Sequence, residues 1–159
     1  MSITLTLELG YEFAVKASAK SVFDVLSDVP TSASFYPQVN ELVDLGDNSY
    51  RWDMEPVGLE HINLQIVYAS AYTSNRKKGA VNWAPVPGVG NAQVAGSWQI
   101  STQNKATYIV LTVEASITLP LPSLMKMVVQ PVVEAEFERL TETYIANLCE
   151  HFGGEVEFD

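Results

Sequence analysis

The sequence has few of the residues that usually carry metal or covalent chemistry. Its 159 residues include a single cysteine, Cys149, and two histidines, His61 and His151. A single cysteine excludes an internal disulfide and fits a reducing compartment. Neither histidine has a second histidine or a cysteine at metal-ligand spacing, so we expect no metal site and no cofactor.

Basic residues are also scarce, since nine lysines and arginines stand against nineteen acidic residues and leave a net charge of −10. Phosphate groups bind basic surfaces, which excludes nucleic acid as a partner and disfavours an anionic membrane surface. Residues 134–159 hold eight acidic residues and one basic residue, so they contribute −7 of that charge. We interpret this acidic end as a solvated surface, with a docking site for a basic protein as the alternative.

The chain lacks a long apolar run as well. No stretch approaches the roughly eighteen apolar residues that span a membrane, and the first nine residues lack the basic and apolar regions of a signal peptide. Apolar residues still make up 47% of the sequence, enough for a packed core. We therefore expect a cytoplasmic protein with one domain over residues 1–159, of which 153–159 form a terminal tail.

Much of the sequence alternates apolar and polar residues, the pattern of strands with one buried face. Two long runs, Ile3–Val15 and Ile109–Leu119, show it most clearly, and shorter runs between them are separated by turn residues. About seven antiparallel strands are predicted in total. The Pro/Gly-rich segment Ala84–Asn91 is interpreted as a rigid loop, since no lysine and helix follow it as in a phosphate-binding loop.

Helical spacing occurs in two places. After the first strand, an N-cap at Ser18 predicts a short helix that Pro30 ends, and a second short turn is predicted over Thr31–Tyr36. Apolar residues then recur at helical spacing from Val129 to Phe152, and Pro131 inside this long helix predicts a kink near Met127. Because the apolar face of the sheet needs a partner, we expect the sheet to curve around this helix.

This order of elements resembles the helix-grip superfamily of START-like lipid-transfer domains, birch-pollen-allergen-like proteins, polyketide cyclases and coenzyme-Q-binding proteins. The segments FAVKASAKSVFDVL and SDVPTSASFYPQV look like its first strand and helix pair. GSWQIS, ATYIVLTVEASI and LPLPSLMKMVVQPVVEAEFERLTETYIANL look like its last strands and terminal helix. The predicted fold class is therefore α+β, with a curved antiparallel sheet wrapped around the C-terminal helix and two short helices after the first strand.

The resemblance implies a cavity between the sheet and the terminal helix that holds a lipid, sterol, quinone or polyketide-like molecule. The sequence itself supplies large apolar residues on the faces that would meet, although these residues would equally fill a solid core. Leu121–Met127 and the Ala84–Asn91 loop are predicted at the mouth, and Val133→Trp is predicted to fill the cavity. The residues predicted to bind the ligand are Trp52, Met54, Leu64, Tyr68, Trp83, Trp98, Met125, Val129, Val133 and Phe137.

No catalytic residues are assigned, which favours a binding protein over an enzyme. Strand parity places Glu8, Glu12, Glu114, Arg51 and Asp53 on outward faces. The inward polar groups are the side-chain tips of Tyr11, Tyr50, Tyr68 and Trp98. Such hydroxyl and indole groups orient ligands, and the tyrosines are poor bases at neutral pH. Two alternatives stay open: a cyclase or dehydratase acting on a polyketide-like substrate, and a regulator that binds a protein through the acidic C-terminal helix. Neither the ligand nor the oligomeric state follows from the sequence.

Overall fold

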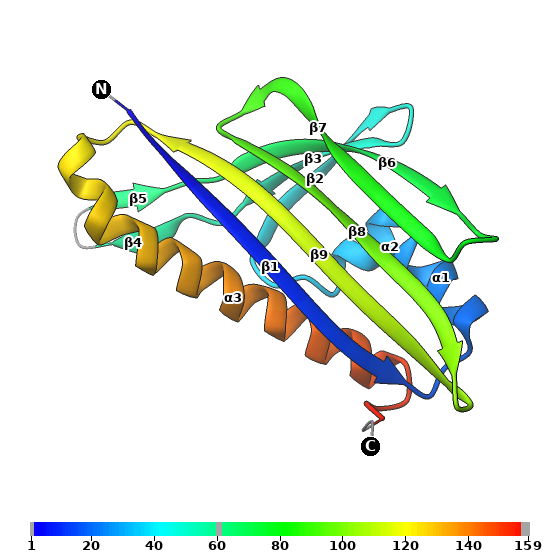
Figure 1. The fold of residues 1–159 in the computed structure, drawn as a ribbon. Coiled ribbons are helices and arrows are strands. Elements are labelled where there is room, and N and C mark those ends of the chain that lie inside the picture. Colours follow the sequence, from blue (N-terminus) through cyan, green and yellow to red (C-terminus); the bar gives the residue numbers. More distant parts are fainter. Residues whose placement is uncertain (1, 60–61, 157–159) are drawn as a thin grey trace.

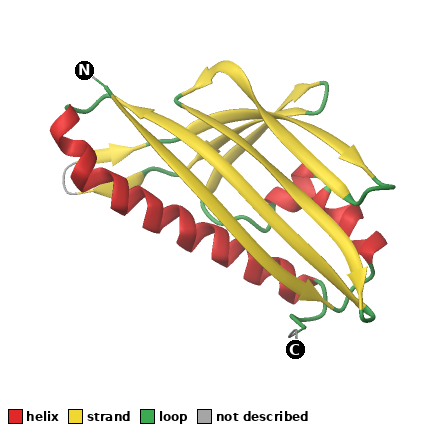
Figure 2. Cartoon of the chain, in the orientation of Figure 1, coloured by secondary structure: helices red, strands yellow, loops and turns green. Residues whose placement is uncertain are grey.

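The computed structural model describes residues 2–59 and 62–156, and its architecture is α+β, with an antiparallel sheet that curves around a long helix (Figure 1; Figure 2). This confirms the predicted fold class, including the two short helices after the first strand. The elements are β1 (Ile3–Val15), α1 (Ala19–Leu26), α2 (Val29–Ala33), β2 (Val39–Gly46), β3 (Ser49–Met54), β4 (Val57–Leu59), β5 (Ile62–Leu64), β6 (Val67–Asn75), β7 (Ala80–Gly90), β8 (Ala92–Gln103), β9 (Ala106–Leu119), the 3-10 turn η1 (Ser123–Met125) and α3 (Lys126–His151).

The main sheet has seven strands in the order β1-β9-β8-β7-β6-β3-β2, and β4 and β5 form a separate hairpin. The two long alternating runs of the sequence are β1 and β9, which pair from Ile3 opposite Leu119 to Val15 opposite Thr107. The alternation predicts the buried face of β1 at its start, where Ile3, Leu5 and Leu7 are buried and the residues between them are exposed.

Helix α3 packs on the sheet along the stripe predicted from the sequence, with Val129, Val133, Leu140, Tyr144 and Leu148 among its buried residues. The 3-10 turn η1 forms first, and α3 starts at Lys126. The kink near Met127 stays a prediction, and α3 is one helix across that residue. Pro131 stands close to the start of α3, and the helix continues through it to His151 (Figure 1).

The boundary that the sequence analysis predicts between the two short helices is wrong. Helix α1 already ends at Leu26, and Pro30 lies in the first turn of α2. A proline is tolerated at this position because the first N–H groups of a helix have no partner within it. Asp28 is the N-cap, and its carboxylate accepts a hydrogen bond from the N–H of Thr31 at 3.4 Å.

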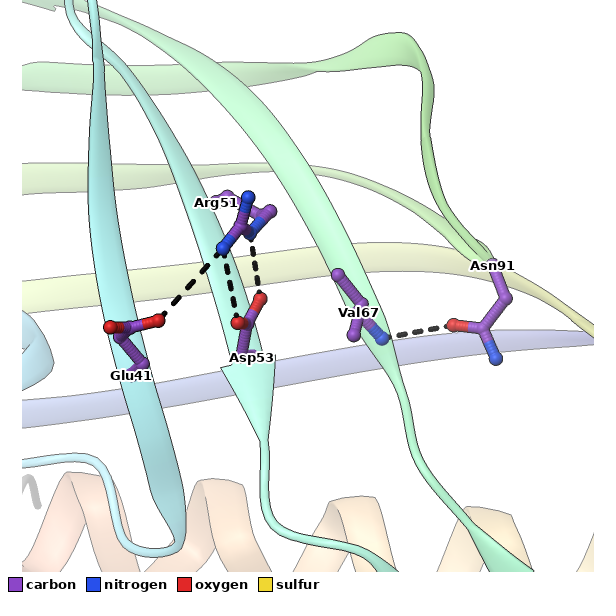
Figure 3. Close-up of polar contacts among 5 residues, drawn as sticks. All are labelled: Glu41, Arg51, Asp53, Val67 and Asn91. Carbon is purple, nitrogen blue, oxygen red and sulfur yellow. Dashed lines mark hydrogen bonds and ion pairs between the residues drawn. The ribbon is translucent and has the colours of Figure 1, made fainter.

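The prediction of a loop at Ala84–Asn91 is also wrong, because β7 continues to Gly90. A register shift in the pairing of β7 with β6 accommodates its prolines. Gly90 has a φ of 70°, and a Cβ there would lie 2.0 Å from the carbonyl oxygen of Val67. The side chain of Asn91 fixes the same corner, since its Oδ1 accepts a hydrogen bond from the N–H of Val67 at 2.9 Å (Figure 3). This segment is therefore part of the sheet.

The buried apolar side chains form two clusters along α3. The first core cluster lies where β1 begins, β9 ends and α3 begins, and its buried members are Ile3, Leu5, Leu7, Val29, Ala33, Trp52, Met54, Leu64, Ile66, Ala92, Ile117, Leu119, Val129 and Val133. The second lies at the other end of the same elements and includes Phe13, Leu26, Trp98, Leu111, Tyr144 and Leu148. Within the described residues, no helix is both long and apolar enough to cross a membrane.

Candidate functional site

A cavity of about 80 Å³ lies where the two core clusters meet, between the sheet, α2 and α3. Aromatic side chains dominate its lining: Tyr36, Trp52, Tyr68, Tyr72, Trp83, Trp98, Phe137 and Tyr144. Aliphatic side chains complete the walls, together with two hydroxyl residues, Ser32 and Thr141; the aliphatic ones are Leu7, Leu9, Leu26, Val29, Val94, Leu111, Val113 and Ala115.

The strands place several of these rings by direct pairing. Trp52 on β3 and Tyr68 on β6 are cross-strand partners, and their rings stack with centroids 5.8 Å apart and planes 11° apart. Trp83 on β7 lies opposite Gly96 on β8. A Cβ at Gly96 would lie 2.5 Å from the Trp83 ring and 2.4 Å from the carbonyl oxygen of Thr112. The glycine therefore allows the indole to lie directly against the backbone of the next strand.

Hydrogen bonds between side chains hold part of the aromatic lining in place. The indole N–H of Trp52 donates to the hydroxyl of Tyr72 at 3.0 Å. The hydroxyls of Tyr36 and Thr141 lie 3.4 Å apart, and those of Ser32 and Tyr144 are also hydrogen-bonded. The last two pairs each join α2, or the turn after it, to α3. All four of these residues line the cavity on that side.

Other polar tips of the lining have no partner within the described part of the chain. No hydrogen bond within the described residues involves the hydroxyl of Tyr68 or the indole N–H of Trp83 or Trp98. Every fully enclosed side-chain nitrogen or oxygen among the described residues is hydrogen-bonded. All three residues line the cavity, so their hydroxyl and indole N–H groups are candidates for a hydrogen bond to a ligand.

Burial keeps the tyrosines of the cavity in their neutral form. It raises the pKa of Tyr36 to about 12 and raises the pKa of Tyr68, Tyr72 and Tyr144 as well. Desolvation is the largest cause in each case, because a phenolate loses more hydration than a phenol. At neutral pH these hydroxyls are protonated and cannot serve as general bases.

No carboxylate, histidine, lysine or arginine lies among the described residues that line the cavity. Glu8, Glu12 and Glu114 are exposed, as the strand parity predicts. Arg51 and Asp53 pair with each other, with the Arg51 Nε–Asp53 Oδ1 distance at 2.9 Å, and Arg51 also lies 3.9 Å from Glu41 (Figure 3). Glu55 is exposed, and His61 lies outside the described residues.

The residues predicted to bind a ligand fall into two groups. Trp52, Tyr68, Trp83, Trp98 and Phe137 line the cavity together. Met54, Leu64, Val129 and Val133 are buried in the first core cluster outside this lining, and Met125 packs against the same cluster. Ligand contact remains a prediction for both groups, but the cavity brings only the first group together.

The sequence reasoning missed Tyr36, Tyr72 and Tyr144 as lining residues. Tyr144 lies on the helical stripe, and Tyr72 shares the strand face of Tyr68, so both signals are present in the sequence. The position of Tyr36 depends on the turn after α2, which no periodicity predicts. Of the inward tips that were predicted, Tyr50 lies beside the cavity, where its ring makes an edge contact with Tyr72 at a centroid distance of 6.0 Å.

The remaining candidates for chemistry lie elsewhere. Burial, together with nearby Glu155, raises the pKa of the Cys149 thiol to about 11, so the thiol is protonated and unreactive at neutral pH. His151 is exposed, with its ring 4.9 Å from that of Phe35. The described residues contain no cluster of histidine, cysteine and acidic side chains suited to a metal ion.

Comparison with known proteins finds solved structures that have a similar fold. No family model and no curated protein matches the chain. Among solved structures, the Zhui aromatase/cyclase from a Streptomyces species superposes with a TM-score of 0.70 at 14% identity, covering 93% of this chain and 94% of that chain. A START superfamily protein from Mycobacterium smegmatis superposes with a TM-score of 0.65 at 15% identity, covering 93% and 97%.

A plant structure gives a similar result. The ginseng major latex-like protein 151 superposes with a TM-score of 0.59 at 10% identity, covering 93% of this chain and 98% of that chain. At sequence identities this low, the superpositions show that the proteins share a fold, and they do not show that the proteins share a function. Because the matches span nearly the whole of each chain, and this chain has the seven-stranded sheet, the helix pair and the long terminal helix, it has the helix-grip fold.

Proposed function

We propose that this protein binds a hydrophobic small molecule in the cavity between sheet and α3, without covalent chemistry. The observation that carries the proposal is the composition of the lining, which combines apolar walls with neutral hydroxyl and indole groups and, among the described residues, has no acid or base that ionises at neutral pH. Ligand sites in proteins are mostly apolar, with a few polar groups that fix orientation. Burial of a ligand's apolar surface supplies about 25 cal/mol per Å².

The cavity also limits the ligand. Its 80 Å³ is below the roughly 300 Å³ at which pockets for drug-sized ligands begin. A larger ligand therefore enters only when part of the lining moves outward. The hydroxyl pairs Ser32–Tyr144 and Tyr36–Thr141 are the contacts that such a movement would break on the side of α2.

The aromatase/cyclase neighbour makes a cyclase the second candidate, since this chain shares its fold. A cyclase that moves protons needs a group that titrates near neutral pH within reach of the substrate. The described lining offers only phenols with raised pKa values, which favours binding over catalysis.

Native mass spectrometry of the purified protein, paired with organic extraction, tests the proposal. We expect an apolar molecule at near-stoichiometric amount, or uptake of naphthalene as a minimal apolar probe after extraction. A folded protein that carries nothing and takes up no apolar probe would contradict the proposal. Conversion of an added polyketide-like substrate would support the cyclase instead.

A further inference from the structure

A second pocket, with a volume of about 530 Å³, adjoins the aromatic cavity and differs from it in chemistry. It lies where the link between α1 and α2 meets the β2–β3 turn and strand β6. Its own lining consists of polar or amphipathic side chains: Ser27, Asp28, Asn48, Tyr50 and Ser74. In contrast to the cavity, this pocket has an acidic side chain, Asp28, in its lining.

Two residues belong to both pockets. Val29 and Tyr72 line the cavity on one side and the polar pocket on the other. The Tyr72 ring lies between that of Tyr50, at a centroid distance of 6.0 Å, and that of Trp83, at 5.7 Å. A continuous row of aromatic rings therefore leads from the polar pocket into the cavity. An elongated ligand that displaces the Tyr72 ring or slides past it would occupy both.

The charged side chains that line the polar pocket or act on Tyr50 are acidic among the described residues. Asp28 is in its lining, and Asp44 and Asp28 both act on Tyr50, whose pKa burial and these two carboxylates raise. No lysine, arginine or histidine occurs among the described residues that line either pocket. Arg76, two residues after Ser74 in the chain, is paired with Asp24 at 2.6 Å and lies over the ring of Phe23.

We propose that the polar pocket receives the polar end of the ligand whose apolar body occupies the cavity, and that this end is a protonated amine. The inference rests on the proposed binding function and specifies its ligand class. An ammonium group donates hydrogen bonds to the Asp28 carboxylate and to hydroxyl oxygens, and it is attracted to the face of the Tyr50 ring. A carboxylate at the same place would face Asp28 without a counter-ion.

Three probes with one apolar body and different ends test this proposal: naphthylbutylamine, naphthylbutanol and naphthylbutanoic acid, with naphthalene as the reference. Dissociation constants are measured at neutral pH and low salt by titration calorimetry. We expect the amine to bind about tenfold more tightly than the acid, with the alcohol between them, as suits a partly exposed ion pair.

The variant Asp28→Asn isolates the charge, because asparagine caps a helix as well as aspartate does and α2 keeps its first turn. We expect the preference for amine over acid to fall below about threefold, while binding of the alcohol and of naphthalene is unchanged. Glu8→Gln removes one exposed acidic charge far along β1 and is the matched control, with the preference retained.

Each outcome decides between the two proposals. Binding of the acid as tight as that of the amine, or a preference that survives Asp28→Asn, overturns the amine-binding pocket and leaves the cavity proposal standing if naphthalene still binds. Failure of naphthalene and all three probes to bind overturns both. A parallel salt titration should weaken amine binding and leave naphthalene binding unchanged, because only an ion pair is screened by salt.

Discussion

The first core cluster and the aromatic cavity are built from the same strands and helix and share Leu7, Val29 and Trp52, yet the rest of the cluster is packed core and the cavity is hollow. Leu5 and Leu9 stand on the same face of β1, and Leu5 is fully buried in the first cluster whereas Leu9 lines the cavity. Apart from Trp52, the buried members of the first cluster are aliphatic or methionine side chains. The larger side chains that line the cavity are mostly aromatic.

This difference in side-chain type explains the difference in packing. Aliphatic side chains interdigitate to the density of an organic crystal. Aromatic rings are flat and rigid, and in the cavity several of them are fixed by hydrogen bonds such as that from Trp52 to Tyr72. Rings held in this way cannot collapse into the space between them. The sheet thus presents a solid part that stabilises the fold and a rigid hollow part available for binding.

We expect the largest loss of stability when Leu5, a leucine of the first core cluster, is shortened. Leu5→Ala should cost about 2–5 kcal/mol in the free energy of unfolding, because a fully packed site retains a void. Leu9→Ala should cost less than half as much, since Leu9 already borders open space. Urea denaturation of both variants measures the comparison, and equal costs would contradict it.

Alkaline pH tests the aromatic part through its tyrosines. The pKa of Tyr36 rises from 10.0 in the unfolded chain to about 12 in the folded protein, so the unfolded chain loses its proton first. The stabilisation is complete below pH 10 and is lost as the pH rises toward 12, by up to roughly 3 kcal/mol for this residue. Urea denaturation from pH 8 upward measures the loss, and Tyr36→Phe should reduce it by the share of this residue, while the other buried tyrosines still contribute.

An intermediate effect is expected from overpacking the solid part. Val133→Trp, predicted from the sequence to fill the cavity, instead places an indole in the first core cluster, where Val133 is fully buried. We expect a loss of about 1–3 kcal/mol in stability. Thermal unfolding measures it, and a stable variant that merely loses ligand uptake would show that Val133 faces the cavity after all.

The smallest effect on stability is expected from filling the hollow part. Ala115→Leu adds three carbon atoms to a residue of β9 that lines the cavity. We expect the free energy of unfolding to change by less than about 1 kcal/mol and the affinity for naphthalene to fall at least tenfold. Ser116→Leu, one residue further along the strand and on its other face, is the matched control and should bind naphthalene as before. Equal binding by both variants would count against the cavity as the binding site.

Periodicity predicted most of the fold, because it depends on which face of each element is buried. The alternation of β1 and the stripe from Val129 to Phe152 are both confirmed. The segment Ala84–Asn91 was missed, since prolines and glycines usually mark loops, and only the pairing partner and the register shift reveal a strand there.

The candidate site was predicted only in part for a related reason. An inward-facing residue looks the same in sequence whether its neighbours fill the space or leave it open. Met54 and Val129 share the pattern of Trp52 and Phe137, but only the last two line the cavity. The pairing of Ser32 with Tyr144 depends on how α2 lies against α3, and no local pattern encodes it.

The contact between Trp83 and Gly96 ties the wall of the cavity to the pairing of the sheet. The indole lies against bare backbone, so the shape of the cavity at this point depends on the absence of a single methyl group. A Cβ at position 96 would meet the carbonyl oxygen of Thr112 as well as the ring, so it would disturb the pairing of β8 with β9 together with the cavity. One glycine outside the lining is therefore required by the fold and by the cavity at the same time.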